Sequence, residues 1–339
     1  MKGFTSDVWV RRGGRFAVSG GLLAVLWFVV DGGEVLERLA GMELPWVALA
    51  ILVSAVQVGL LAWQWRFTAL RLGLRLSYGR ALREYYLAVF MNQVLPGGML
   101  GDLSRAWRHG RREEAGGKAL RAVVMERGSG QVVMAGVALV SLAVLLPSPG
   151  EVFRGLLPAF GAAVVVVALG LGVTARSARL RRRLAGPVAR SWADVRAAFL
   201  SPRALPVQLA CSSLAVASYL AVFLLSARAL SVPASASALL PLAAPVLLAM
   251  LIPLSVAGWG VREGVAALLW TLVGLDAVEG VAISVSYGLL IFMGSLPGGV
   301  LLLLAIVHSG PGRRGGRVPE GSGGRTGEEP HSERRWGPA

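Results

Sequence analysis

The chain contains few of the residues on which metal sites and redox chemistry depend. Of its 339 residues, one is cysteine, Cys211, and three are histidine. A single cysteine excludes an intramolecular disulfide framework, and its position inside an apolar run indicates a small packing residue. The histidines fall in a basic loop, at the end of an apolar run and in the C-terminal tail: His109, His308 and His331. The sequence therefore predicts no metal site.

Nucleotide-binding signatures are also missing from the sequence. It has no phosphate-binding Walker loop, no zinc-protease motif and no soluble nucleotide-binding domain. The glycines at Gly258, Gly260 and Gly264 have the wrong last spacing for a dinucleotide fingerprint, and no strand precedes them. We expect no cofactor and no direct use of ATP.

Long apolar runs dominate the chain. Hydrophobic residues make up 55% of it, mean hydropathy is +0.64, and about 20 apolar residues are needed to span a bilayer. Six runs are predicted to be spans, and two further segments are interrupted by proline and glycine. The spans are at about 16–30, 45–65, 119–146, 155–175, 205–230 and 280–307, and the broken segments at about 84–101 and 237–275. The sequence predicts an all-α polytopic membrane protein.

The net charge of +15 comes from Lys and Arg residues at the edges of these runs. The charge therefore indicates how the chain is oriented in the membrane, and it predicts no nucleic-acid partner. Lys and Arg gather at 2–15, 66–83, 105–121, 176–203 and 313–335, whereas the loops 31–44, 147–154 and 275–279 carry mainly acids. The positive-inside rule then puts both termini in the cytoplasm. Because arginine greatly outnumbers lysine and Ala, Gly, Leu and Val are abundant, the composition is typical of GC-rich bacterial coding. We expect a bacterial cytoplasmic (inner) membrane.

The broken segments are predicted to be re-entrant hairpins. The first begins and ends among arginines, so it should enter from the cytoplasm, whereas arginine-poor loops flank the second, which should enter from outside. The order span, span, hairpin, span then occurs twice in opposite orientation, which is an inverted repeat. The alternative is that either hairpin is instead two complete short spans, which gives eight crossings. The predicted divisions are a basic N-terminus (1–15), a transmembrane domain (16–307) and a disordered tail (308–339).

The basic loop 176–203 contains a second kind of helix signal. Its apolar residues are spaced four, three and four apart, at Val188, Trp192, Val195 and Phe199. This pattern predicts an amphipathic helix at the cytoplasmic membrane surface. The alternative is a linker that packs on the protein.

The two broken segments share one motif. Counted from Pro96 and from Pro253, each has a glycine five residues on, an arginine nine residues on and a nearby carboxylate: Gly101, Arg105 and Asp102, then Gly258, Arg262 and Glu263. Broken backbone at membrane depth is tolerated where it is buried in protein or lines a cavity. A matched pair of broken segments, one in each half, is the best sequence indication of a transporter-like site.

The ionisable residues at membrane depth come as acid–base pairs, in which Asp102 accompanies Arg105, Glu126 accompanies Arg127 and Glu263 accompanies Arg262. Such residues are functional candidates because they are costly in lipid. Arginine forks and new helix N-termini near Met99 and Trp259 together suit a phosphate or carboxylate group. The alternative is that the pairs are structural pins between helices. The candidate substrate-binding residues are Asn92, Pro96, Gly97, Gly98, Gly101, Asp102, Arg105, Glu126, Arg127, Gly258, Gly260, Arg262 and Glu263.

At these residues the chain resembles the flippase-like transmembrane region of the lysylphosphatidylglycerol synthases. The matching signatures are Asn92-x-x-Leu-Pro-Gly-Gly98 with Gly101-Asp102 and Arg105, Glu126-Arg127 with Gly130, Gly258-Trp-Gly-Val-Arg-Glu-Gly264, and Leu296-Pro-Gly-Gly299. They cover roughly residues 15 to 307. The resemblance implies a lipid-handling membrane protein that flips phospholipids and has no enzyme activity, since the synthases' aminoacyl-transferase domain has no counterpart here. The arginine forks and helix N-termini, and not the resemblance, predict membrane lipids with an anionic head group as partners.

Two other functions stay open at this point. The chain could be an accessory subunit that docks a lipid- or glycan-biosynthesis enzyme through the basic loop. It could also be a membrane-embedded enzyme that uses Asp102 or Glu263 as acid or base, although no nucleophile–base pair is visible.

Overall fold

The computed structural model describes residues 20–95, 98–145, 186, 191–251 and 257–308. This part of the chain contains helices and no strands. The N-terminus 1–15, the predicted span at 155–175, Pro96, Gly97 and the tail from residue 309 lie outside it. Within the described residues, the prediction of an all-α membrane protein is confirmed.

Four described helices are long and apolar enough to cross a membrane. They are α3 (Leu44–Arg71), α6 (Gly116–Leu145), α9 (Leu205–Ala229) and α12 (Ala277–His308). They match four of the six predicted spans. Part of a fifth, 16–30, is described as an apolar helix at Gly20–Val29, and α2 (Gly32–Ala40) follows it with Asp31 as its N-cap.

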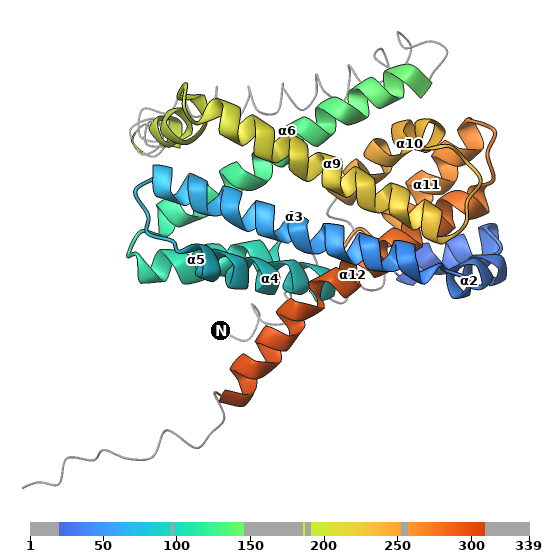
Figure 1. Cartoon of the computed structure of the whole chain (residues 1–339), viewed down its shortest axis with the longest axis horizontal. Coiled ribbons are helices and arrows are strands. Elements are labelled where there is room, and N and C mark those ends of the chain that lie inside the picture. Colours follow the sequence, from blue (N-terminus) through green and yellow to red (C-terminus); the bar gives the residue numbers. More distant parts are fainter. Residues whose placement is uncertain (1–19, 96–97, 146–185, 187–190, 252–256, 309–339) are drawn as a thin grey trace, which may run out of the picture. The chain divides into compact units, whose positions relative to one another are not determined.

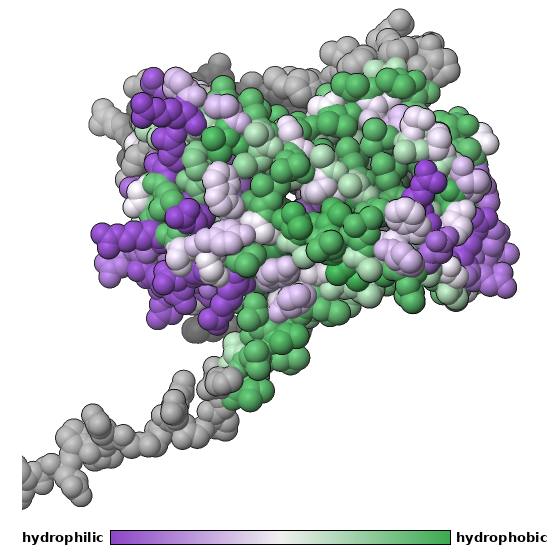
Figure 2. Space-filling model, in the orientation of Figure 1, coloured by the Kyte–Doolittle hydropathy of each residue, from purple (hydrophilic) through white to green (hydrophobic). Residues whose placement is uncertain are grey.

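The outer faces of these helices are apolar. Leu52, Val56, Val132, Val140 and Leu214 are all more than half exposed, which suits contact with lipid chains. Figure 2 shows hydrophobic side chains over the middle of α3 and α9 and hydrophilic ones toward the two ends.

Both broken segments form helical hairpins. The first consists of α4 (Tyr78–Val94) and α5 (Leu100–Arg112). The second consists of α10 (Ala236–Leu248), a short 3-10 turn and α11 (Val261–Leu272). Three of these helices have 12 or 13 residues, and at 1.5 Å per residue they are about 20 Å long, less than the roughly 30 Å of a bilayer core. These lengths fit the predicted hairpins.

The basic loops meet at one end of the bundle. Arg71 Nη2 donates to Ser201 Oγ at 3.4 Å, the Arg75 amide donates to Glu113 at 3.1 Å, and Arg121 Nε lies 2.6 Å from Asp194. Because α4 begins and α5 ends beside these contacts, the first hairpin opens at this basic end.

The acidic loops meet at the opposite end. The Glu43 amide donates to the Ala229 carbonyl at 2.8 Å, Ser231 Oγ donates to the Glu43 carboxylate at 2.7 Å, and Arg38 lies 3.9 Å from Asp276. The second hairpin starts just after Ser231 and ends just before Asp276, so it opens at the acidic end.

Each hairpin packs on the long helix of the other half. The helix α12 contacts α4. A Cβ on Gly298 would overlap the Tyr86 carbonyl, and the ring centroids of Phe90 and Phe292 lie 6.3 Å apart. In return α10 packs on α6, while α3 and α9 lie side by side (Figure 1). This exchange is what an inverted repeat requires. Gly294 also allows close helix packing, since a Cβ at this position would meet Ser54 Cβ of α3 at 3.0 Å.

The basic loop 176–203 is described mainly over its last part. Residues 191–195 are α-helical and continue into a π-helical turn, Arg196–Leu200. Phe199 packs against the buried cluster around Trp65, whereas Trp192 is 58% exposed. Val188 lies outside the described residues. The described part is thus attached to the protein on one side and leaves Trp192 free.

Candidate functional site

The break between α4 and α5 is held by one amide side chain. Asn92 Oδ1 accepts the Gly101 amide hydrogen at 2.8 Å, and Asn92 Nδ2 donates to Asp102 Oδ2 at 2.8 Å. A Cβ at Gly101 would overlap the Ala88 carbonyl of α4, so the close approach of the two helices requires glycine. Asn92 therefore satisfies a free amide at the start of α5 and orients the Asp102 carboxylate.

Arg105 joins α5 to α6 in the interior. Its side chain is fully buried, with Nε 2.9 Å from Asp102 Oδ1 and Nη2 2.5 Å from Glu126 Oε2. The guanidinium lies over the Trp65 and Tyr85 rings, at 4.6 and 4.4 Å from their centroids. Ion pairing and cation–π contact together compensate its desolvation, which makes Arg105 a cross-link between helices.

Arg127, the next arginine, has different surroundings. Its side chain is 28% exposed, and Nη2 lies 2.9 Å from Asp102 Oδ2. The Nε atom is buried without a hydrogen-bond partner. Arg105 likewise has one buried nitrogen, Nη1, without a partner in the described part of the protein, so what distinguishes Arg127 is its partial exposure beside open space.

The second break is built from glycine backbone. Gly258 and Gly260 have φ of +83° and +89°, a left-handed region that side chains disfavour. The Gly260 amide donates to Glu263 Oε2 at 2.7 Å, so Glu263 closes the start of α11.

Arg262 is as buried as Arg105. It pairs with Glu263 Oε1 through Nη2 at 2.5 Å and donates from Nε to Ser284 Oγ of α12 at 2.8 Å. Its guanidinium carbon lies 5.2 and 5.3 Å from the Trp259 and Tyr287 ring centroids. In both halves a hairpin arginine thus ties the second hairpin helix to the following long helix.

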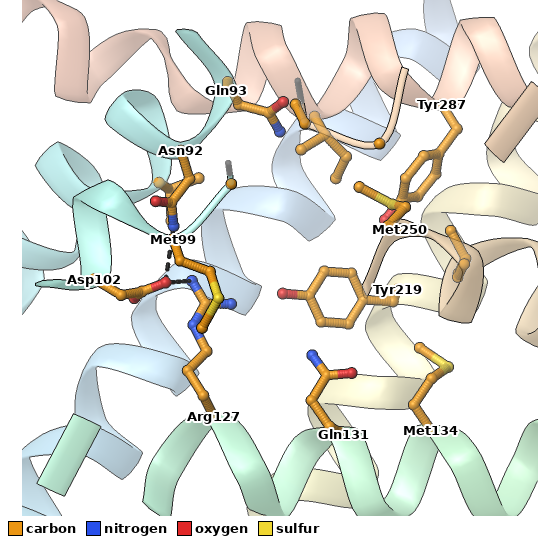
Figure 3. Close-up of a pocket in the computed structure, with 16 residues that line it drawn as sticks. Asn92, Gln93, Met99, Asp102, Arg127, Gln131, Met134, Tyr219, Met250 and Tyr287 are labelled. Carbon is orange, nitrogen blue, oxygen red and sulfur yellow. Dashed lines mark hydrogen bonds and ion pairs between the residues drawn. The ribbon is translucent and has the colours of Figure 1, made fainter. Parts of the chain in front are cut away.

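The two breaks line one cavity of about 270 Å³ (Figure 3). Its walls come from α4, α5, α6, α9, α10 and α12 and from the residues beside each break. They are Val89, Asn92, Gln93, Gly98, Met99, Asp102, Arg127, Gln131, Met134, Tyr219, Leu247, Met250, Ala257, Gly258, Tyr287 and Ile291. This volume lies just below the usual range of small-molecule sites, about 300–1,000 Å³.

The lining divides into polar and apolar groups. Figure 3 shows Asp102 and Arg127 together on one wall, with the Tyr219 hydroxyl directed toward Arg127. Asp102 and Arg127 are the acid and base among the described lining residues, and they balance each other. Methionine and aliphatic side chains supply most of the remaining surface, so the cavity suits a small polar group attached to an apolar one.

The structure divides the sequence-predicted residues into two sets. Asn92, Gly98, Asp102, Arg127 and Gly258 line the cavity. Behind its walls lie Gly101, Arg105, Glu126, Gly260, Arg262 and Glu263, which fix the breaks or connect helices. Pro96 and Gly97 fall outside the described residues.

Sequence reasoning missed several lining side chains, among them Gln93, Gln131, Tyr219 and Tyr287. One signal was available, because Gln131 follows Arg127 by four residues and so shares its helix face. Tyr219 lies in an uninterrupted apolar run, where nothing in the sequence distinguishes it.

No group of His, Cys, Asp and Glu that could hold a metal occurs among the described residues. Cys211 is buried, as expected for a packing residue. His109, in the last turn of α5, lies edge-on to Trp65 at 5.5 Å, and its Nε2 is 3.3 Å from the Arg75 carbonyl. Burial lowers the pKa of the His109 imidazole, which therefore stays neutral at pH 7.

The long apolar helices define a polytopic helical membrane protein. The family model described as the lysylphosphatidylglycerol synthase TM region matches residues 14–298, and the chain belongs to this family. The match is to the transmembrane region, not to a transferase domain. No curated protein matches the chain.

Proposed function

We propose that this protein is a lipid flippase that moves a lipid with an anionic head group across the cytoplasmic membrane of a bacterium. The observation that carries the proposal is Arg127, whose side chain is 28% exposed at a cavity lined by both helix breaks. An arginine fork suits the oxygens of a phosphate. The cavity is the size of a head group, so the acyl chains would stay in the bilayer.

Binding of the head group exchanges the partner of Arg127. Arg127 turns from Asp102 to the phosphate, while Asp102 keeps its bonds to Arg105 at 2.9 Å and to Asn92 at 2.8 Å. The carboxylate is therefore not left unpaired, which keeps the cost of the exchange low. The N-termini of α5 and α11 add partial positive charge nearby.

Transport follows from the two hairpins. One opens at the basic end and the other at the acidic end, and their breaks meet at the cavity. Rocking of one half against the other would expose the cavity to each leaflet in turn. We place the basic end in the cytoplasm by the positive-inside rule.

The test is leaflet exchange by purified protein in phosphatidylcholine vesicles. Tail-labelled phosphatidic acid should exchange faster than labelled phosphatidylcholine, and protein-free vesicles give the background. Conversion of a lipid to a new species would indicate a membrane-embedded enzyme instead. If a folded protein neither exchanges nor converts any lipid in a broad panel, an accessory role in lipid or glycan biosynthesis replaces the proposal.

A further inference from the structure

Two amide side chains face the cavity with no hydrogen-bond partner in the described part of the protein. Gln93 lies on α4 and Gln131 on α6, and both line the cavity. Figure 3 shows them on opposite walls, with the Arg127 and Asp102 pair between them. Both side chains are half-buried, whereas the fully buried glutamines are bonded: Gln64 donates to Gln208 Oε1 at 3.0 Å, and Gln57 donates to Ser218 Oγ at 2.9 Å.

A free amide requires a ligand group that both donates and accepts. The glutamine side chain has an NH₂ donor and a carbonyl acceptor, and leaving either one desolvated and unpaired weakens binding. A hydroxyl group meets both needs. A carboxylate accepts only and an ammonium donates only, so each satisfies half of the amide, and a head group that carries both must also lose the hydration of two charges.

The charged residues of the lining require no charged group on the ligand besides its phosphate. Asp102 and Arg127 balance each other, and one phosphate is enough to engage Arg127. Selection among anionic lipids must then come from neutral groups, for which Gln93 and Gln131 are suitably placed.

We propose that the cavity selects lipids whose phosphate carries an uncharged hydroxyl-rich substituent, a polyol or a sugar, and that Gln93 and Gln131 provide this selectivity. The proposal rests on the proposed function. It adds the substrate class and two specificity-determining residues that do not belong to the charged cluster.

Three tail-labelled lipids test this inference separately from the proposed function. Phosphatidylinositol and phosphatidylserine carry the same net charge but differ in hydroxyl content, and phosphatidic acid has neither substituent. In vesicles with the wild-type protein, phosphatidylinositol should exchange about tenfold faster than phosphatidylserine, the effect of one well-made hydrogen bond to each amide.

The variants assign the selectivity to residues. The double change Gln93→Leu and Gln131→Leu should remove the preference, so that phosphatidylinositol and phosphatidylserine exchange at equal rates. Val140→Leu, at an exposed position of α6 outside the cavity, should keep the preference.

Equal rates for phosphatidylinositol and phosphatidylserine in the wild type, with active phosphatidic acid exchange, would overturn this inference and leave the proposed function intact. A preference that survives the double change would also overturn it. Absence of exchange for all three lipids would refute the proposed function itself. Because the wild-type comparison needs no variant, poor folding of the double variant does not weaken the test.

Discussion

Arg127 and Arg105 share one carboxylate but face different surroundings. The Nη2 atom of each arginine lies 2.9 Å from one oxygen of Asp102. Arg127 is paired with Oδ2 and Arg105 with Oδ1. Arg105 is fully buried, whereas Arg127 is 28% exposed at the cavity. We therefore assign Arg105 to the scaffold and Arg127 to the substrate, and the predictions below separate the two roles.

Replacing Arg105 should damage the protein itself. The change Arg105→Ala leaves Asp102 and Glu126 as buried carboxylates without their shared cation, which costs about 3–5 kcal/mol. We expect low membrane abundance and a clearly lower unfolding temperature in detergent. The double variant Arg105→Gln with Glu126→Gln should be less unstable than Arg105→Ala. Normal abundance of Arg105→Ala would remove Arg105 from the scaffold.

Replacing Asp102 should favour the substrate. Asp102→Asn keeps one oxygen that can accept from Arg105, loses the bond from Asn92, and frees Arg127 from its competing anion. The mole fraction of phosphatidic acid that gives half-maximal exchange should fall roughly threefold to tenfold, the value of a partly screened charge-assisted bond. Glu37→Gln, on the exposed face of α2, should change nothing. A rise in this mole fraction at normal abundance would show that Asp102 does not compete with the substrate.

The Arg262–Glu263 pair should matter through the position of α11. Arg262→Lys keeps the charge but cannot hold Glu263 and Ser284 with the same planar fork. We expect exchange to fall several-fold with abundance near normal, while Arg262→Ala fails to accumulate because Glu263 is left unpaired. Full exchange by a well-folded Arg262→Ala protein would show that this pair is dispensable.

The two hairpins should be accessible from opposite sides of the membrane. In a Cys211→Ala background, single cysteines at Arg83 or Arg112 should label from the cytoplasm, and cysteines at Ser237 or Asp276 from outside. A membrane-impermeant thiol reagent applied to intact cells and to inverted vesicles makes the comparison. Labelling of positions 112 and 237 from the same side would contradict the inverted orientation.

The outline of the fold could be predicted because hydropathy and helix breakers are local signals. The four described spans lie within a few residues of the predicted ones, and α5 begins at Leu100, one residue from the prediction. The start of α11 was placed near Trp259 and lies at Val261, because two left-handed glycines extend the break.

The site was harder to predict because it depends on which side chains meet across helices. The sequence relates the two motifs to each other, and residues of both line the cavity. It does not separate Arg127 from Arg105 and Arg262, since all three are arginines next to or near a carboxylate. Only packing against Trp65, Tyr85 and Ser284 removes Arg105 and Arg262 from the cavity. For the same reason Tyr219, from an apolar span, could not be anticipated.

The most direct test of the account is phosphatidic acid exchange by Arg127→Gln, measured with membrane abundance on the same preparation. Glutamine can still donate a hydrogen bond to Asp102 but removes the positive charge. The matched control is Arg203→Ala, at an exposed position. We expect exchange by Arg127→Gln to fall at least about tenfold, equivalent to about 1.4 kcal/mol of lost head-group binding, with abundance near normal and the control unaffected. Wild-type exchange by a well-folded Arg127→Gln protein would contradict the assignment of Arg127 as the anion-binding residue of this cavity.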